Sequence, residues 1–134
     1  MLEADLTSRL LADATVSGLI QARLYPVVLP DTLLDPNTDT PPSISYRTIS
    51  DVPNYTIEGQ RIGSKTRVEF NSWASSYANA KAVAAAIQAS LEGFNGQLGD
   101  VFVNFIEAGG VNTDGFDQDS RLYRVQQDFL IYHA

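Results

Sequence analysis

The stretch Thr66–Ile87 reads TRVEFNSWASSYANAKAVAAAI and contains two kinds of periodicity. In its first half, Val68 and Phe70 alternate with charged neighbours, which predicts a half-buried strand. Its second half is rich in alanine and repeats apolar residues every three or four positions, which predicts a helix with one buried face. Ser75 or Ser76 is the expected N-cap of that helix. A strand that leads into such a helix predicts a sheet covered by helices.

The sequence on either side continues this pattern. Apolar spacing from Leu2 to Ala14 predicts an amphipathic opening helix. Alternating or dense apolar runs predict further strands, and Pro26 favours a sheet edge for the first of them. These strands are expected within Ala22–Leu29, Ser43–Ser50, Val101–Ile106 and Leu122–His133.

We therefore predict an α+β fold with a mainly antiparallel sheet of four to five strands and two helices on one face. The 134 residues, of which 44% are apolar, can bury one core and are too few for two ordinary domains. The prediction is a single domain over residues 1–134. Its core is expected to consist of the in-phase apolar residues Leu6, Leu10, Val68, Phe70, Val83, Ile87, Leu91, Val103, Phe105, Val125, Phe129 and Ile131.

Three segments are long for loops of so small a domain: Pro30–Pro42, Asp51–Ser64 and Glu107–Ser120. Loops longer than about 12 residues are usually functional or disordered. We therefore expect surfaces that become ordered against partners.

The charge balance argues against nucleic-acid binding. The chain has nine Lys and Arg residues and sixteen Asp and Glu residues, which gives a net charge of -7. The basic residues are scattered singly along the sequence. Cysteine is absent, so disulfides and Cys-ligated metals are excluded. The opening residues lack a positive n-region, and no stretch approaches about 20 apolar residues, so we expect neither a secretory signal nor a membrane span.

Candidate catalytic or binding motifs are each weaker than their structural alternatives. His133 is the single histidine, and a terminal-strand role is favoured over a catalytic triad or metal site. The Gly-containing segment Glu58–Thr66 lacks the phosphate-loop pattern and is followed by a strand, so a hairpin or extended arm is favoured.

Acidic residues also form no convincing site. Asn112, Asp114, Asp117 and Asp119 fail the spacing of an EF-hand loop and predict a solvated turn. Pairs such as Asp117 with Asp119, or Glu58 with Glu69, lack the apolar cleft expected for glycoside hydrolysis. We predict no enzyme activity, no metal and no cofactor.

Four segments, in order and spacing, resemble the family of small phage tail-completion proteins that includes tail terminators. They are Arg23–Pro26 with Leu29–Pro30, the strand PSISYRTIS at Pro42–Ser50, the stretch Thr66–Ile87, and FDQDSRLYRVQQDFLIYH at Phe116–His133. The resemblance covers most of the chain. It implies an α+β subunit of a ring, usually hexameric, in the virion at the head-proximal end of the tail tube.

The resemblance also implies partners. Such a ring is assembled in the host cytoplasm, stops tube growth, contacts the tail tube protein and offers a surface to a head connector or head-closure protein. DNA passes through it without specific binding. The alternatives are a head-closure or neck adaptor protein and, less favoured, a small cytosolic enzyme or binding domain.

Two sets of residues are expected to serve assembly. Apolar residues in Asp51–Ser64 are too many for a free loop, which predicts an arm that packs on a neighbouring subunit or on the tube. Its contact residues are expected to be Val52, Tyr55, Ile57, Arg61 and Ile62. Acids in the long loops are expected to face the channel and repel DNA, namely Glu58, Asp114, Asp117 and Asp119.

Overall fold

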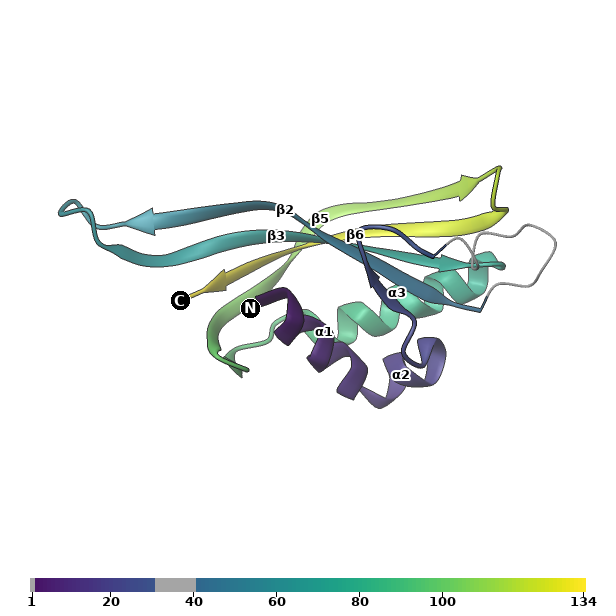
Figure 1. The fold of residues 1–134 in the computed structure, drawn as a ribbon, viewed down its shortest axis with the longest axis horizontal. Coiled ribbons are helices and arrows are strands. Elements are labelled where there is room, and N and C mark those ends of the chain that lie inside the picture. The colour runs from purple at the N-terminus through teal and green to yellow at the C-terminus, as the bar shows by residue number, and fades with distance from the viewer. Residues whose placement is uncertain (1, 31–40) are drawn as a thin grey trace.

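The computed structural model describes residues 2–30 and 41–134, which form one twisted sheet with helices on one side (Figure 1). The helices are α1 (Leu2–Ala12), α2 (Ala14–Ile20) and α3 (Tyr77–Leu91). The strands are β1 (Leu24–Pro26), β2 (Ser43–Tyr55), β3 (Arg61–Ala74), β4 (Gly96–Leu98), β5 (Val101–Asp117) and β6 (Leu122–His133).

The described strands form a six-stranded mixed sheet in the order β1-β2-β3-β6-β5-β4. β1 pairs with β2 in parallel, and the other neighbours are antiparallel. The prediction of four to five strands with two helices is wrong, although the α+β class holds. The predicted number of strands was too low because β4 has only three residues, too few to show a period. The predicted number of helices was too low because the opening helix is divided in two.

That division has a local cause at Asp13. Its carboxylate accepts hydrogen bonds from the backbone N–H groups of Thr15 (2.9 Å) and Val16 (3.2 Å), so Asp13 is the N-cap of a second helix. The predicted cap of α3 is confirmed at Ser76, whose hydroxyl accepts from the N–H of Asn79 at 3.2 Å.

The core lies between the three helices and one face of the sheet. All the predicted core residues are buried except Phe105, which is 44% exposed. The pairing of β5 with β6 shifts between Val103 and Phe105, so Asn104 is an extra residue that reverses the alternation. Ile106 is therefore buried in place of Phe105.

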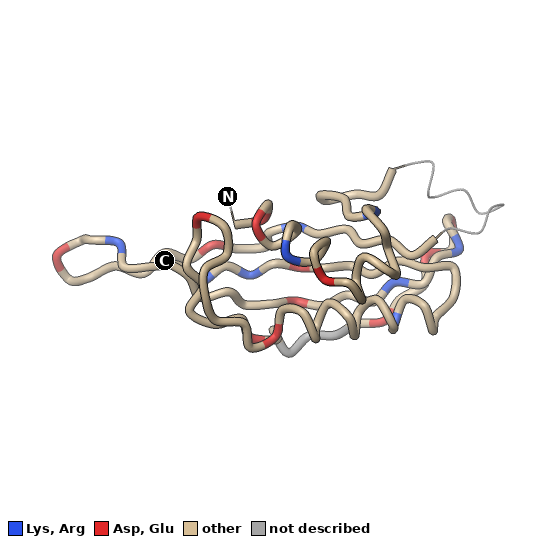
Figure 2. Tube along the Cα trace, turned by 90° about the horizontal axis from the view of Figure 1, so that it is seen from below, with Lys and Arg blue, Asp and Glu red and all other residues tan. Residues whose placement is uncertain are grey.

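Two of the predicted long loops are in fact strand pairs, of which the β2–β3 pair extends beyond the helices and the β5–β6 pair ends beside α3 (Figure 1). β2 and β3 continue through most of 51–64, and β5 continues to Asp117. The two hairpins point to opposite ends of the long axis (Figure 1). The remaining predicted loop, Pro30–Pro42, lies for the most part outside the described residues. Lys and Arg positions are spread among the elements and form no single basic face (Figure 2).

Candidate assembly interface

The β2–β3 arm, residues Asp51–Ser64, is the most exposed apolar part of the described chain. Its turn closes through bonds from Gly59 N–H to Thr56 O (3.0 Å) and from Thr56 N–H to Gln60 O (2.8 Å). Gly59 has φ +89°, a conformation that favours glycine. The exposed apolar side chains are Val52 (50%), Tyr55 (60%), Ile57 (fully exposed) and Ile62 (65%). The structure shows that these apolar residues are exposed on a hairpin, and their role as contact residues stays a prediction.

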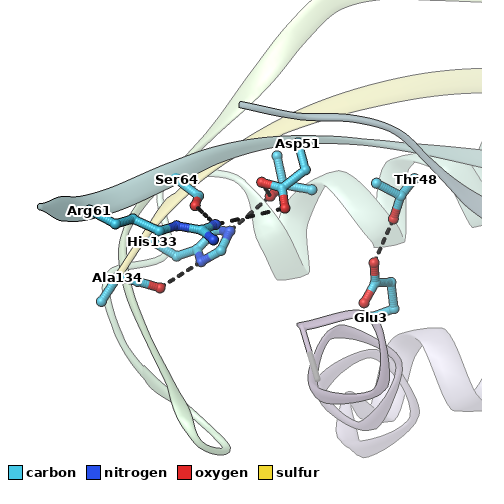
Figure 3. Close-up of polar contacts among 8 residues, drawn as sticks. Glu3, Thr48, Asp51, Arg61, Ser64, His133 and Ala134 are labelled. Atoms are coloured by element: carbon cyan, nitrogen blue, oxygen red, sulfur yellow. Dashed lines mark hydrogen bonds and ion pairs between the residues drawn. The ribbon is translucent and has the colours of Figure 1, made fainter. Parts of the chain in front are cut away.

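Polar contacts hold the base of the β2–β3 arm (Figure 3). The Arg61 guanidinium lies 3.9 Å from the Asp51 carboxylate and bonds to the Ser64 hydroxyl. The Thr48 hydroxyl donates to Glu3 of α1 at 2.7 Å. Arg61, which was predicted as a contact residue, is thus half engaged within its own arm, with its side chain 53% exposed.

His133 lies at the same base but does not form a catalytic triad. Its Nε2 is 2.8 Å from the Thr66 hydroxyl, and that hydroxyl donates to Asp51 at 3.1 Å. In a triad the imidazole lies between hydroxyl and carboxylate, whereas here the hydroxyl lies in the middle. His133 Nδ1 is 2.9 Å from Ala134 O. The arrangement ties the last strand to the arm and orients no general base.

The β5–β6 arm, residues 113–126, is anchored to a helix. Tyr77 of α3 donates to Asp114 at 2.6 Å, and Lys81 pairs with the same carboxylate at 3.1 Å. The hydrogen bond from Tyr77, then the contact with Lys81, lowers the pKa of Asp114. The bond to Asp114 in turn raises the pKa of Lys81. The ring of Tyr123 packs 5.9 Å from that of Tyr77.

The predicted channel acids divide between the two arms. Glu58 is exposed at the tip of the β2–β3 arm. Asp117 and Asp119 lie at the turn of the β5–β6 arm, where Asp117 accepts from the Ser120 hydroxyl (2.7 Å) and from the Asp119 N–H (3.2 Å). Asp114 is bonded to Tyr77 and Lys81 of α3. The four acids therefore form no single cluster within one subunit.

Sequence reasoning missed a charged ladder on the helix-free face of the sheet. Arg47 of β2 pairs with Glu69 of β3, and Arg67 pairs with Asp128 of β6 at 3.0 Å. Glu69 and Asp128 are only 3% and 8% exposed. Glu69 and Asp128 face each other across β3 and β6, and the two arginines offset this repulsion. The alternation of Arg67 and Glu69 with apolar residues could have indicated this charged ladder, because alternate residues of a strand face opposite sides of the sheet.

Two surface hollows accompany these features. One, with a volume of about 540 Å³, lies between α1 and β4, and its Arg9 already donates to Ser90 O and stacks on Phe94. The other, of about 400 Å³, lies where β3 meets the β5–β6 arm and is lined by Trp73, Gly115, Phe116, Asp117 and Arg124. We call it the Trp73 pocket.

Within residues 2–30 and 41–134, no group of three or more His, Asp or Glu side chains is placed to hold a metal ion. The side chain of Asn112 lies outside the described residues. No helix in the described chain is long and apolar enough to cross a membrane.

Comparison with known protein families identifies the family of this chain. The model of a family described as tail completion protein gp17 matches residues 4–134. The chain belongs to the tail completion protein gp17 family. Membership confirms the resemblance drawn from the sequence and assigns the chain to the structural proteins of phage tails.

A solved structure shares the fold. A chain in the virion of a native gene transfer agent particle superposes with a TM-score of 0.72 at 21% identity, covering 98% of this chain and 93% of that chain. At this identity the likeness shows the fold alone. The search of curated proteins found no match.

Proposed function

We propose that the chain is a subunit of a ring, most simply a hexamer, that caps the head-proximal end of a phage tail tube. The ring stops tube polymerisation and offers a surface to the head connector or head-closure protein. The observation that carries this proposal is the family match over residues 4–134. The exposed apolar residues of the β2–β3 arm support it, because such patches on a small protein mark contact sites.

In this proposal the β2–β3 arm makes the contacts with a neighbouring subunit or with the tube. Val52, Tyr55, Ile57 and Ile62 supply apolar area, and Arg61 supplies a charge at the base. In an antiparallel arm each strand pairs one edge with the other strand, so only the two outer edges are unpaired where the arm leaves the body.

Acidic residues are proposed to keep DNA from adhering inside the ring. Six copies at -7 each would carry -42, and carboxylates facing a channel repel phosphates over about 8 to 10 Å at physiological salt. Glu58 and the acids of the β5–β6 arm lie at opposite ends, so both groups line a channel only if the long axis runs along it. If the long axis lies across the channel, only one end of the subunit can line it. The channel acids are then either Glu58 or the group Asp114, Asp117 and Asp119.

The proposal is tested by the mass of the purified chain in sedimentation velocity over a range of concentrations. A hexamer has about six times 14.6 kDa, and a chain that stays at 14.6 kDa up to millimolar concentration contradicts the ring. In an arm variant, residues 54–63 are replaced by an Asn-Gly turn, which suits a two-residue hairpin between the paired residues Pro53 and Ser64. We expect this variant to stay folded and to lose assembly.

A matched control changes an exposed aromatic residue away from the arm. Phe102 is 45% exposed on β5. The Phe102→Ser variant is expected to assemble like the parent chain. Equal loss of assembly in both variants would show that the arm has no special role.

A further inference from the structure

The Trp73 pocket contains a cation that lacks an acceptor. The Arg124 guanidinium lies 5.9 Å from the centre of the Trp73 ring and beside Gly115. In the part of the chain that the structure describes, it forms no hydrogen bond or ion pair. The nearby Asp117 carboxylate is already bonded to its own turn. A partly buried guanidinium next to aromatic rings favours a carboxylate with an apolar neighbour as its ligand.

Pocket walls match such a ligand. Trp73 alternates with the core residues of β3 and therefore lies on the helix-free face, where its indole N–H donates to Ser45 at 2.9 Å. Phe116 stacks on Tyr123 with ring centres 4.8 Å apart and lies with it on the helix-covered face, so the aromatic wall beside Arg124 is the Trp73 ring. The pocket volume of about 400 Å³ falls in the range of sites that enclose small groups, about 300 to 1,000 Å³.

The chain itself carries the complementary pair at the tip of the β2–β3 arm. Ile57 is fully exposed, and the neighbouring Glu58 is exposed with no hydrogen bond or ion pair among the described residues. An apolar side chain beside a free carboxylate is what the Trp73 ring and the Arg124 guanidinium would receive. Both partners would exchange solvent for a charge-assisted pair.

Within one subunit the tip cannot reach the pocket. Ile62 and Trp73 lie on the same strand, eleven residues apart, which is about 36 Å at about 3.3 Å per residue. The tip and the pocket lie toward opposite ends of the molecule (Figure 1). The occupant must therefore come from a second copy. A contact between two different surfaces of identical subunits runs head to tail and closes into a ring when the rotation allows.

We propose that Ile57 and Glu58 of one subunit occupy the Trp73 pocket of the next, where the Glu58 carboxylate pairs with the Arg124 guanidinium. This inference rests on the proposed ring and specifies its subunit contact. It assigns Glu58 to the interface and leaves Asp114 and Asp119 as the channel candidates, because Asp117 lines the occupied pocket.

Charge exchange tests the pair. The variants are Glu58→Arg, Arg124→Glu and the double variant, compared with the parent chain by sedimentation velocity at 150 mM salt. We expect each single change to weaken self-association by about tenfold or more and the double change to recover most of it. Thermal melting checks that each variant is folded. Single variants that assemble like the parent chain, or a double variant no better than the singles, overturn the contact.

Cysteine crosslinking tests the same contact without disturbing the charges. The chain has no cysteine, so Ile57→Cys combined with Gly115→Cys gives thiols only at the tip and beside Arg124 in the pocket. Oxidation is expected to give a ladder of covalent oligomers above the dimer, since a disulfide forms only when the Cα atoms approach within about 7 Å. The Ile57→Cys variant alone can give no product larger than a dimer.

The outcomes separate this contact from the ring itself. A double-cysteine variant that assembles but yields no ladder overturns the tip-to-pocket contact and leaves the ring in place. A parent chain that remains monomeric overturns both the ring and this contact.

Discussion

The two hairpin arms differ in how they are held. The β5–β6 arm is tied to α3 through Tyr77, Lys81 and Asp114, and it also carries the aromatic contacts of Tyr123. The β2–β3 arm is bonded to α1 near its base, where Thr48 donates to Glu3, and its outer part carries exposed apolar residues.

The two arms therefore differ in the contacts that stabilise them. The anchored arm finds partners for its side chains inside the subunit. The free arm has backbone pairing but little side-chain packing, so its apolar groups remain available to another molecule. We therefore regard the β2–β3 arm as the part completed by assembly, and the predictions below test that distinction.

The largest effect is expected in the body that both arms share. Phe70 and Phe129 are buried, with ring centres 5.9 Å apart. Phe70→Ala or Phe129→Ala should lower the free energy of unfolding by about 3 to 5 kcal/mol because each leaves a cavity. Chemical denaturation measures this. An unchanged midpoint for both variants would mean that the sheet register is wrong.

A second comparison tests the bulge at the start of β5. Ile106 is buried and Phe105 is 44% exposed. Ile106→Ala should cost about 2 to 5 kcal/mol, whereas Phe105→Ala should cost about 1 kcal/mol or less. The reverse order of the two midpoints would place Phe105 in the core and remove the bulge.

Hydrogen exchange compares the arms directly. The backbone amides of Val52, Asn54 and Tyr55 should exchange about tenfold or more faster than those at 113–117 in the unassembled chain, because local opening is easier where few side chains pack. On assembly the first set should slow more than the second. Equal rates in the unassembled chain would mean that the two arms are equally held.

The smallest effect concerns the anchor of the β5–β6 arm. Asp114 has a lowered pKa, so its charge contributes stability above its unfolded pKa, and that contribution is lost as the pH falls through the folded pKa. Asp114→Asn should therefore lower the melting temperature slightly at pH 7, and the difference should vanish well below pH 4, near the ordinary range of Asp. Melting curves at several pH values measure it, and a constant difference at all pH values would rule out the ion pair.

Periodicity predicted those parts of the fold that lie against the core. α3 and the buried faces of β3 and β6 followed from one-sided burial, whereas the Ser76 cap and the edge strand at Pro26 followed from the backbone chemistry of serine and proline. The extensions of β2, β3 and β5 did not, because a strand exposed on both faces has no reason to alternate. β4 was too short to show a period.

The candidate assembly interface was also only partly predictable from the sequence. The apolar residues of the β2–β3 arm stood out in the sequence, since exposed isoleucines in a turn-rich segment need a partner. The Trp73 pocket did not, because Trp73 and Arg124 are brought together only by the pairing of β3 with β6. Trp73 lies on the face opposite to the core residues of β3, because it alternates with them along the strand.

The central claim is that this chain caps a tail tube, and tube assembly tests it most directly. The tail tube protein of the same phage would be polymerised with and without the purified chain and viewed by negative-stain electron microscopy. We predict shorter tubes with a ring at one end when the chain is present. Tubes of unchanged length with no density at either end would contradict the claim.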